Sequence, residues 1–195
     1  MIDNEQILKL HDILTLTRLI DDVWLIGGAV LGYERDGALL PHETDIDLAI
    51  KYPHLLVKVI PALAEAGFNG LHTSRNNKGH RGQWTYKNPG FKFEFLTQHV
   101  CEVGHQFYCH YQGDEYMREI PHYATEVVEM LGRKWRMPAD RDTYLTHQYG
   151  DWRTPNPDWK YWRDCPSNVS IEKWKFSHEK WDGKRMPASS SPETL

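Results

Sequence analysis

With 195 residues, the chain is long enough for one domain with a proper hydrophobic core, and its net charge of −4 gives no reason to expect general nucleic-acid binding. The three cysteines form no even disulfide framework, the first twenty residues lack the basic and then apolar pattern of a signal peptide, and no apolar run approaches the length of a membrane span. We therefore expect a protein of the reducing cytoplasm with no transmembrane segment; peripheral association with the inner face of a membrane remains open.

The N-terminal segment has the periodicity of an amphipathic helix, because its apolar residues recur at helical spacing from Asn4 to Ile20. Asp3 or Asn4 is the predicted N-cap, since either side chain can accept a hydrogen bond from the first helical turn. We interpret His11, on this helix, as a surface or packing residue. The β-rich run Val23–Ile26 predicts the first strand.

The first strand breaks at a pair of glycines, Gly27 and Gly28, and a helix is predicted to follow as far as a turn near Asp36 and Gly37. Because glycine has no Cβ atom, its backbone can come close to a ligand. The N–H groups at the start of a helix also attract phosphate. Gly27 and Gly28 are therefore candidate phosphate-binding residues.

Asp45 and Asp47 lie on the next predicted strand. Alternate side chains of a strand share a face, so the two carboxylates point the same way, while Ile46, Leu48 and Ile50 point to the other face. Like charges this close repel and raise each other's pKa unless a cation lies between them. Carboxylate oxygens suit Mg²⁺ or Mn²⁺, which bridges to substrate phosphates. A metal site that faces the candidate phosphate-binding glycines indicates an enzyme whose reaction takes place at a phosphorus atom.

Beyond this strand, Pro53 opens a second predicted helix, which Pro61 must kink or divide and which Gly67 ends. The polar segment Leu71–Gly82 is predicted to be a loop. It holds a cluster of basic residues: Arg75, Lys78, His80 and Arg81. A solvated loop and a phosphate-contacting loop both remain open, and in the second case Arg81 is a candidate substrate contact.

Two further hairpins are predicted. The first joins Gln83–Tyr86 to Phe91–Thr97 through Asn88-Pro89-Gly90, with alternating aromatic residues on one face of its second arm and Glu94 on the other. The second hairpin lies between Tyr123 and Met137. Between the hairpins, His99–His110 lacks the paired ligand spacing of a zinc site, and its second half alternates like a strand.

After Pro138, a short helix is predicted from Asp140 to Tyr149, closed by Gly150. Tyr144, Leu145 and Gln148 fall near one face of it. We expect one domain over residues 1–185, in which residues 152–185 are an aromatic, proline-rich extension with a short helix over Ile171–Trp181. Residues 186–195 have the composition of a disordered tail.

The run from Gly28 to Asp47 resembles the signature of the LicD/fukutin-type phosphotransferases, members of the nucleotidyltransferase-fold superfamily. The residues that carry the resemblance, in register and without a gap, are Gly28, Leu31, Gly32, Arg35, Pro41, Asp45 and Asp47. The departures are Ala29 in place of a threonine, His42 in place of a tryptophan, and Glu43 and Thr44 at the first two acidic positions. A second patch, Met137–Trp152, is similar to the C-terminal signature, in which a proline leads into a YL…YG helix.

The resemblance implies an α/β (α+β) fold with a nucleotidyltransferase-like mixed, mostly antiparallel sheet and helices packed on it. It also implies a third acid on the strand beside the two aspartates, and Glu94 is the residue that we assign there. The alternative is that Glu94 pairs with Lys92 or Lys87 on an exposed face. By the same resemblance, Tyr149 and Asp151 lie near the nucleotide end of the active site.

The implied activity is the metal-dependent transfer of a phosphorylated alcohol, such as phosphocholine or ribitol phosphate, from a CDP-activated donor to a glycan hydroxyl. Asp45, Asp47 and Glu94 would bind the metal, Arg35 would pair with a donor phosphate or with Asp36 or Glu43, and Glu94 would accept the proton of the acceptor hydroxyl. Two alternatives remain: a nucleotidyltransferase that moves an NMP from an NTP and releases pyrophosphate, and a non-catalytic binding module.

Overall fold

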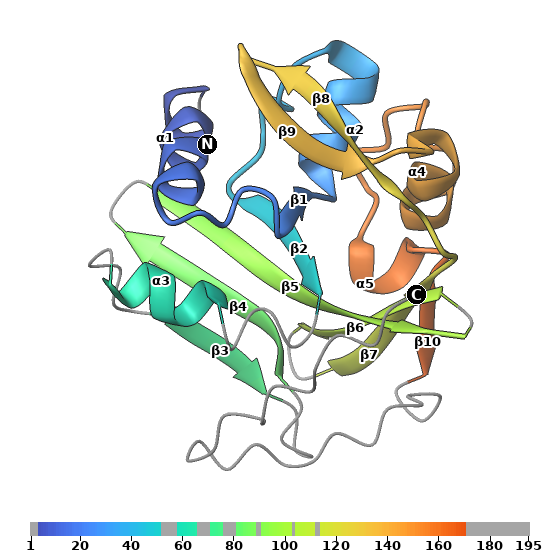
Figure 1. Cartoon of the computed structure of the whole chain (residues 1–195). Helices are drawn as coiled ribbons and strands as arrows, with labels where there is room; N and C mark the ends of the chain where they lie inside the picture. The colour runs from blue at the N-terminus through green and yellow to red at the C-terminus, as the bar shows by residue number, and fades with distance from the viewer. Residues whose placement is uncertain are drawn as a thin grey trace.

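An eight-stranded mixed sheet forms the centre of the described structure (Figure 1). The computed structural model describes residues 4–51, 58–65, 71–75, 81–88, 91–102, 104–111 and 114–170. The strands of this sheet are β1 (Val23–Leu25), β2 (Ile46–Lys51), β3 (Leu71–Arg75), β4 (Arg81–Asn88), β5 (Phe91–Cys101), β6 (Gly104–Tyr111), β7 (Asp114–Ile120) and β10 (Asn168–Ser170). The pair β2 and β5 is parallel, and the other neighbouring pairs are antiparallel. The predicted mixed, mostly antiparallel sheet is confirmed.

The 11-residue strand β5 connects the two halves of this sheet. Its first residues pair with β2 and with β4, and its last residues pair with β6. Phe93 and Phe95 of β5 are fully buried, and so are Leu48 and Ile50 of β2. The predicted alternation is thus confirmed, and it leaves the opposite face of both strands for polar side chains.

Five helices and a second, two-stranded sheet complete the described part of the chain. They are α1 (Asn4–Leu16), α2 (Gly28–Asp36), α3 (Ile60–Glu65), α4 (Arg141–Tyr149) and α5 (Tyr161–Asp164), with the paired strands β8 (Thr125–Met130) and β9 (Arg133–Pro138). In the view of Figure 1, α1, α2, α4 and the β8–β9 hairpin lie above β5, and α3 lies beside β3 and β4. Helix α2, which follows the glycine turn, contacts both β2 and α4. It is therefore held by the sheet on one side and by the helix of the Met137–Trp152 patch on the other.

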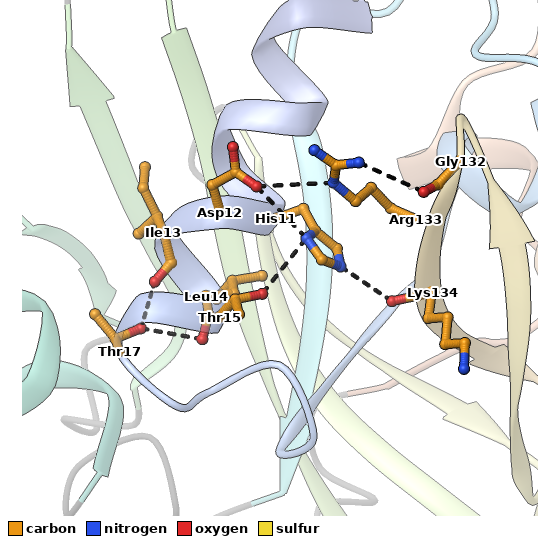
Figure 2. A network of polar contacts seen from close by, with 9 residues as sticks. All are labelled: His11, Asp12, Ile13, Leu14, Thr15, Thr17, Gly132, Arg133 and Lys134. Carbon is orange, nitrogen blue, oxygen red and sulfur yellow. Dashed lines mark hydrogen bonds and ion pairs between the residues drawn. The ribbon is translucent and has the colours of Figure 1, made fainter.

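Helix α1 contacts β9 through His11, whose Nε2 atom is 3.2 Å from the carbonyl oxygen of Lys134 (Figure 2). The imidazole of His11 also lies edge-on to the indole ring of Trp135 at 4.9 Å. The interpretation of His11 as a packing residue is confirmed. The helix ends at Leu16, earlier than predicted, because Arg18 takes a left-handed φ of 58° and directs the following chain back into the core.

The predicted hairpin after Tyr123 is confirmed, and so is the helix that follows it. Leu131 and Gly132 join β8 to β9 with φ values of 54° and 68°, the left-handed pair typical of a two-residue hairpin turn. In α4, the carboxylate of Asp140 accepts a hydrogen bond of 3.0 Å from the backbone N–H of Thr143, which is the capping contact expected at a helix start. Gly150, with a φ of 73°, ends the helix.

Two stretches that were predicted to be loops contain regular structure instead. Part of the polar segment Leu71–Gly82 forms β3 and the start of β4, and among the described strands β3 pairs only with β4, at an edge of the sheet. The aromatic segment after Trp152 contains α5 and β10, because β7 offers a free edge for three residues to pair with. Strand β7 itself was not predicted, because its charged residues interrupt the alternation of apolar and polar residues that marks a strand.

Several predictions lie outside the described residues. They are Asp3 as the N-cap, Pro53 and Gly67 as helix boundaries, Lys78 and His80 of the basic cluster, the turn residues Pro89 and Gly90, and the helix and tail after residue 170. The single domain over residues 1–185 stays a prediction. None of the helices in the described part of the chain has the length and apolarity that crossing a bilayer requires.

A buried polar cluster links β1, β5, β6 and the segment before β8. The hydroxyl of Tyr123 donates to Oε1 of Gln98 over 2.6 Å and accepts a hydrogen bond of 3.0 Å from Nε1 of Trp24. Nδ1 of His105 lies 3.0 Å from the same Gln98 oxygen, and the imidazole stacks on the Tyr123 ring at 4.2 Å. Burial, and after it the positive charges of His122 and Lys51, lower the pKa of His105 to about 4.

We predict that His105 makes the fold sensitive to acid. The pKa of His105 is about 4 in the folded chain and about 6.5 when unfolded, so the unfolded state binds more protons between these values and stability falls as the pH drops through this window. From about pH 7 to about pH 4.5, the wild type should lose about 2 kcal/mol more than a His105→Gln variant in urea denaturation. Parallel stability curves for the two proteins would contradict this prediction.

Candidate functional site

Asp45, Asp47 and Glu94 converge at the parallel pair of strands. Asp45 directly precedes β2, and Asp47 of β2 lies opposite Glu94 of β5 in the parallel register. Because residues in register on neighbouring strands share a face, all three carboxyl groups point to the same side of the sheet. One carboxylate oxygen from each residue lies within 4.8 Å of the others.

The glycine turn lies directly against this acidic group. Gly27 has a φ of 60° and a ψ of −133°, a conformation that is accessible almost only to glycine. A Cβ atom on Gly27 would lie 3.0 Å from Oδ2 of Asp47, and one on Gly28 would lie 1.9 Å from Oε1 of Glu43. The start of α2 and the carboxylates therefore approach each other because no side chain separates them.

Tyr144 of α4 holds the turn from the other side. Its hydroxyl accepts a hydrogen bond of 3.1 Å from the backbone N–H of Gly27. The Tyr144 ring is buried and lies edge-on to the ring of Tyr123 at 5.5 Å. Since the Gly27 N–H is already engaged, the N–H groups that α2 presents at its N-terminus begin with Gly28. In the described residues, no side chain caps this end of the helix.

Burial and neighbouring negative charge raise the pKa of two carboxyl groups at this site, Asp47 and Glu43. Burial raises the pKa of Asp47 well above its usual range, and the charges of Asp45, Glu94 and Glu43 raise it further, while Lys92 acts in the opposite direction. Burial, and after it the charge of Asp45, raise the pKa of Glu43 to about 7. Both groups are thus disfavoured as carboxylates, first by burial and then by the neighbouring negative charges.

Lys92 is the cation within this group. Its ammonium pairs with Asp45 and, at 2.8 Å, with Oε1 of Glu94, and that oxygen also accepts a hydrogen bond of 3.0 Å from the hydroxyl of Thr85. The alternative of a Glu94–Lys92 pair is therefore observed, but Glu94 is buried rather than on an exposed face. The side chain of Asp47 has no hydrogen bond or ion pair within the described residues.

The donor set fits an oxygen-ligated divalent cation. Lys92 supplies one positive charge to three clustered carboxylates, and Asp47 among them is buried. All the ligand atoms are oxygens, which hard divalent cations prefer. The carboxyl group of Glu43 also has no side-chain hydrogen bond or ion pair among the described residues, so its position is not fixed by a partner.

A cavity of about 1050 Å³ opens from the acidic group. Among the residues that line it, α2 contributes Arg35, α4 contributes Gln148 and Tyr149, and β7 contributes Arg118. The aromatic segment from Trp152 to Tyr161 forms another part of its wall. The cavity thus joins the two patches of sequence that carry the family resemblance.

Most of the predicted site residues line this cavity. Gly27, Gly28 and Arg35 line it, as do Tyr149 and Asp151. No pairing of Arg35 with Asp36 or Glu43 is found in the described part of the chain. Arg81 begins β4, but its side chain is outside the described residues, so its predicted substrate contact stays a prediction.

Sequence reasoning named one of three further cavity residues only as an alternative, and it did not place the other two at the cavity. Lys92 was the alternative partner of Glu94, and the alternation of β5 does place the two residues on the same face. Gln148 was placed near one face of its helix with Tyr144 and Leu145, yet nothing in the pattern indicated that this face borders a cavity. Arg118 had no signal at all, because β7 was not predicted.

The fold and the acidic group define a mixed α/β protein with a candidate divalent-cation site beside a helix N-terminus. The chain is 26% identical, over 175 residues, to the ribitol-5-phosphate transferase FKTN of Homo sapiens, and the same identity and length are found for FKTN of Macaca fascicularis and of Mus musculus. The aligned region covers 86% of this chain but 37% of each relative, so the chain spans little more than a third of their length. No protein-family model matches the sequence.

We predict that Gly27→Ala destabilises the chain more than Gly37→Ala does. Gly37 also has a positive φ, of 63°, but a Cβ atom there would meet nothing within 4 Å. Gly37→Ala should cost about 1 kcal/mol of backbone strain, whereas Gly27→Ala should cost about 2 kcal/mol or more, because its ψ is also unfavourable and its Cβ would press on Asp47. Urea denaturation of both variants measures the difference, and equal costs would contradict the described turn.

We also predict that Lys92→Met makes the chain less stable and makes its stability respond more strongly to a divalent cation. Without a divalent cation, the variant should lose about 1–2 kcal/mol of stability, because two carboxylates lose their ion pair. Adding Mn²⁺ should then raise the melting temperature of the variant more than that of the wild type, since the ammonium no longer competes for the same oxygens.

Lys58→Met is the matched control, because Lys58 pairs with Asp22 at 2.8 Å and is half exposed. It should cost less than about 1 kcal/mol and leave the effect of Mn²⁺ unchanged. Identical Mn²⁺ responses of the wild type and Lys92→Met would rule out a shared cation position.

Proposed function

We propose that the chain is a LicD/fukutin-type phosphotransferase of the nucleotidyltransferase-fold superfamily. In this proposal it transfers a phosphorylated alcohol from a CDP-activated donor to a glycan hydroxyl in a metal-dependent reaction. The observation that carries the proposal is the parallel register that sets Asp47 opposite Glu94, with Asp45 and the glycine turn beside them. The similarity to ribitol-5-phosphate transferases favours ribitol phosphate as the transferred group.

In this proposal the cation is Mg²⁺, or Mn²⁺, held by Asp45, Asp47 and Glu94, because carboxylate oxygens suit these hard cations. When bound, it would neutralise negative charge on the transferred phosphoryl group. The N–H groups at the start of α2, from Gly28 onward, are positioned to receive a donor phosphate, because the helix dipole is positive at this end. Arg35 lines the same cavity and is the proposed ion-pair partner of a phosphate oxygen.

In the proposed reaction, the acceptor hydroxyl oxygen forms a bond to the phosphorus of the alcohol phosphate. The bond from that phosphorus to the oxygen of CMP breaks, and its electron pair leaves with CMP. The hydroxyl proton passes to a carboxylate, which we assign as Glu94. Thr85 and Lys92 would hold Glu94 in one orientation during this transfer, since both contact its Oε1 atom. Tyr149 is the proposed contact to the nucleotide part of the donor.

We predict that the purified chain, given Mg²⁺, CDP-ribitol and a glycan acceptor, releases CMP. Asp47→Asn should lower the rate by at least about a hundredfold, because it removes a carboxylate from the proposed metal ligands. Asp36→Asn is the matched control, since this residue is an exposed aspartate at the end of α2, and its variant should retain wild-type activity.

The same assay separates the proposal from its alternatives. CDP-choline, CTP and ATP are offered in parallel, and both CMP and pyrophosphate are measured. Pyrophosphate release from an NTP without CMP release from any CDP-alcohol would identify a nucleotidyltransferase instead. A non-catalytic binding module would release neither product and would gain no stability from Mg²⁺.

A further inference from the structure

Gln148 is a buried amide in the cavity wall, and its oxygen is unpaired as far as the described residues go. Its side chain is only 3% exposed, and it lines the cavity from α4. Within the described residues, its Oε1 atom has no hydrogen-bond partner. Buried polar atoms are nearly always paired, because leaving one unpaired forfeits the hydrogen bond that it made with water. An unpaired acceptor in the wall of a cavity therefore indicates the place of a ligand donor.

Trp159 adds the complementary group. Its indole Nε1–H is buried without a partner in the described part of the chain, and the residue lines the same cavity. The ring of Trp159 lies 4.7 Å from the ring of Tyr149, the residue next to Gln148. The wall of this one cavity thus carries two aromatic rings together with an acceptor and a donor that have no partner among the described residues.

Arg118 gives this region a fixed positive charge. Its guanidinium lies over the ring of Phe107 at 5.7 Å and over the ring of Tyr161 at 5.3 Å, and the residue is buried in the cavity wall. Burial raises the pKa of the Tyr149 hydroxyl, Glu43 and Asp47 raise it further, and Arg118 lowers it. Tyr149 is therefore within electrostatic reach of both the acidic group and Arg118, so this region continues from the proposed phosphate site.

We infer that Gln148 and Trp159 form a subsite that binds the nucleobase of the donor and selects cytosine over uracil; the inference rests on the proposed function. A flat base can stack on the aromatic rings while its edge presents both a donor and acceptors. The exocyclic amino group of cytosine would donate to Oε1 of Gln148, and a ring acceptor of cytosine would receive the Trp159 N–H. Uracil has a carbonyl in place of that amino group, so it would leave the Gln148 oxygen facing another acceptor.

A flexible polyol chain fits this region less well than a base does. Each hydroxyl of a polyol both donates and accepts, so a polyol needs no separate acceptor and donor in the wall. It also has no π-face to stack on Tyr149 and Trp159. The transferred alcohol is therefore expected elsewhere in the cavity.

The test compares the binding of CMP, UMP and ribitol 5-phosphate to the full chain with Mg²⁺, by isothermal titration calorimetry. The wild type should bind CMP at least about tenfold more tightly than UMP. Gln148→Leu should lose about tenfold in CMP affinity and most of the preference for CMP over UMP. Its melting temperature without ligand should not fall, because the deleted oxygen has no partner to lose, and this separates a ligand contact from a structural one.

Two further variants keep the test decisive. Trp159→Phe retains an aromatic ring but removes the N–H donor, and it should also weaken CMP binding. Thr146→Ala, on the exposed face of the same helix, should bind CMP as the wild type does.

Each contrary outcome points to a different failure. CMP binding that Gln148→Leu and Trp159→Phe leave unchanged would overturn the subsite while leaving the proposed function intact. Loss of ribitol 5-phosphate binding instead of CMP binding would overturn the assignment to the nucleobase. A wild type that binds no cytidine nucleotide would overturn the proposed function and the subsite together.

Discussion

The parallel pairing of β2 with β5 is the constraint on which the candidate site depends. Parallel strands bring residues from distant parts of the chain into register on one face, and here the pair is Asp47 and Glu94. The apolar residues of both strands are buried on the other face, so the register cannot slip by one residue without exposing the core. The same packing that buries Phe93 and Leu48 therefore forces the carboxylates together.

Two stretches of sequence that carry the family resemblance are linked by an ion pair between Arg141 and Glu34 and by a hydrogen bond at the glycine turn. The backbone N–H of Gly27, at the glycine turn, donates to the hydroxyl of Tyr144, in the later YL…YG helix. On the other side of the turn, Lys92 offsets part of the negative charge by pairing with Asp45 and Glu94. The site is thus preorganised by backbone shape, by one buried tyrosine and by one lysine, while Asp47 is left without a protein partner among the described residues.

The sequence predicted those elements whose local pattern agrees with their tertiary environment. The β5 strand alternates because its aromatic residues lie on one face and Glu94 lies on the other, and Asp140 and Gly150 mark a helix by their capping chemistry. β3 and β10 were missed because both are short and lie at edges, where pairing with a neighbour decides the conformation more than the strand's own residues do. No local pattern could have placed Arg118 or the unpaired Gln148 oxygen at the cavity, since both positions result from long-range packing.

The most direct test of the central claim is a crystal structure of the chain with Mn²⁺ and CDP-ribitol. The account predicts an anomalous manganese peak coordinated by Asp45, Asp47 and Glu94, with the donor phosphates against the start of α2 and Lys92 displaced from at least one of its carboxylates. No manganese peak at this position, with Lys92 still paired to both Asp45 and Glu94 and the donor bound elsewhere, would contradict it.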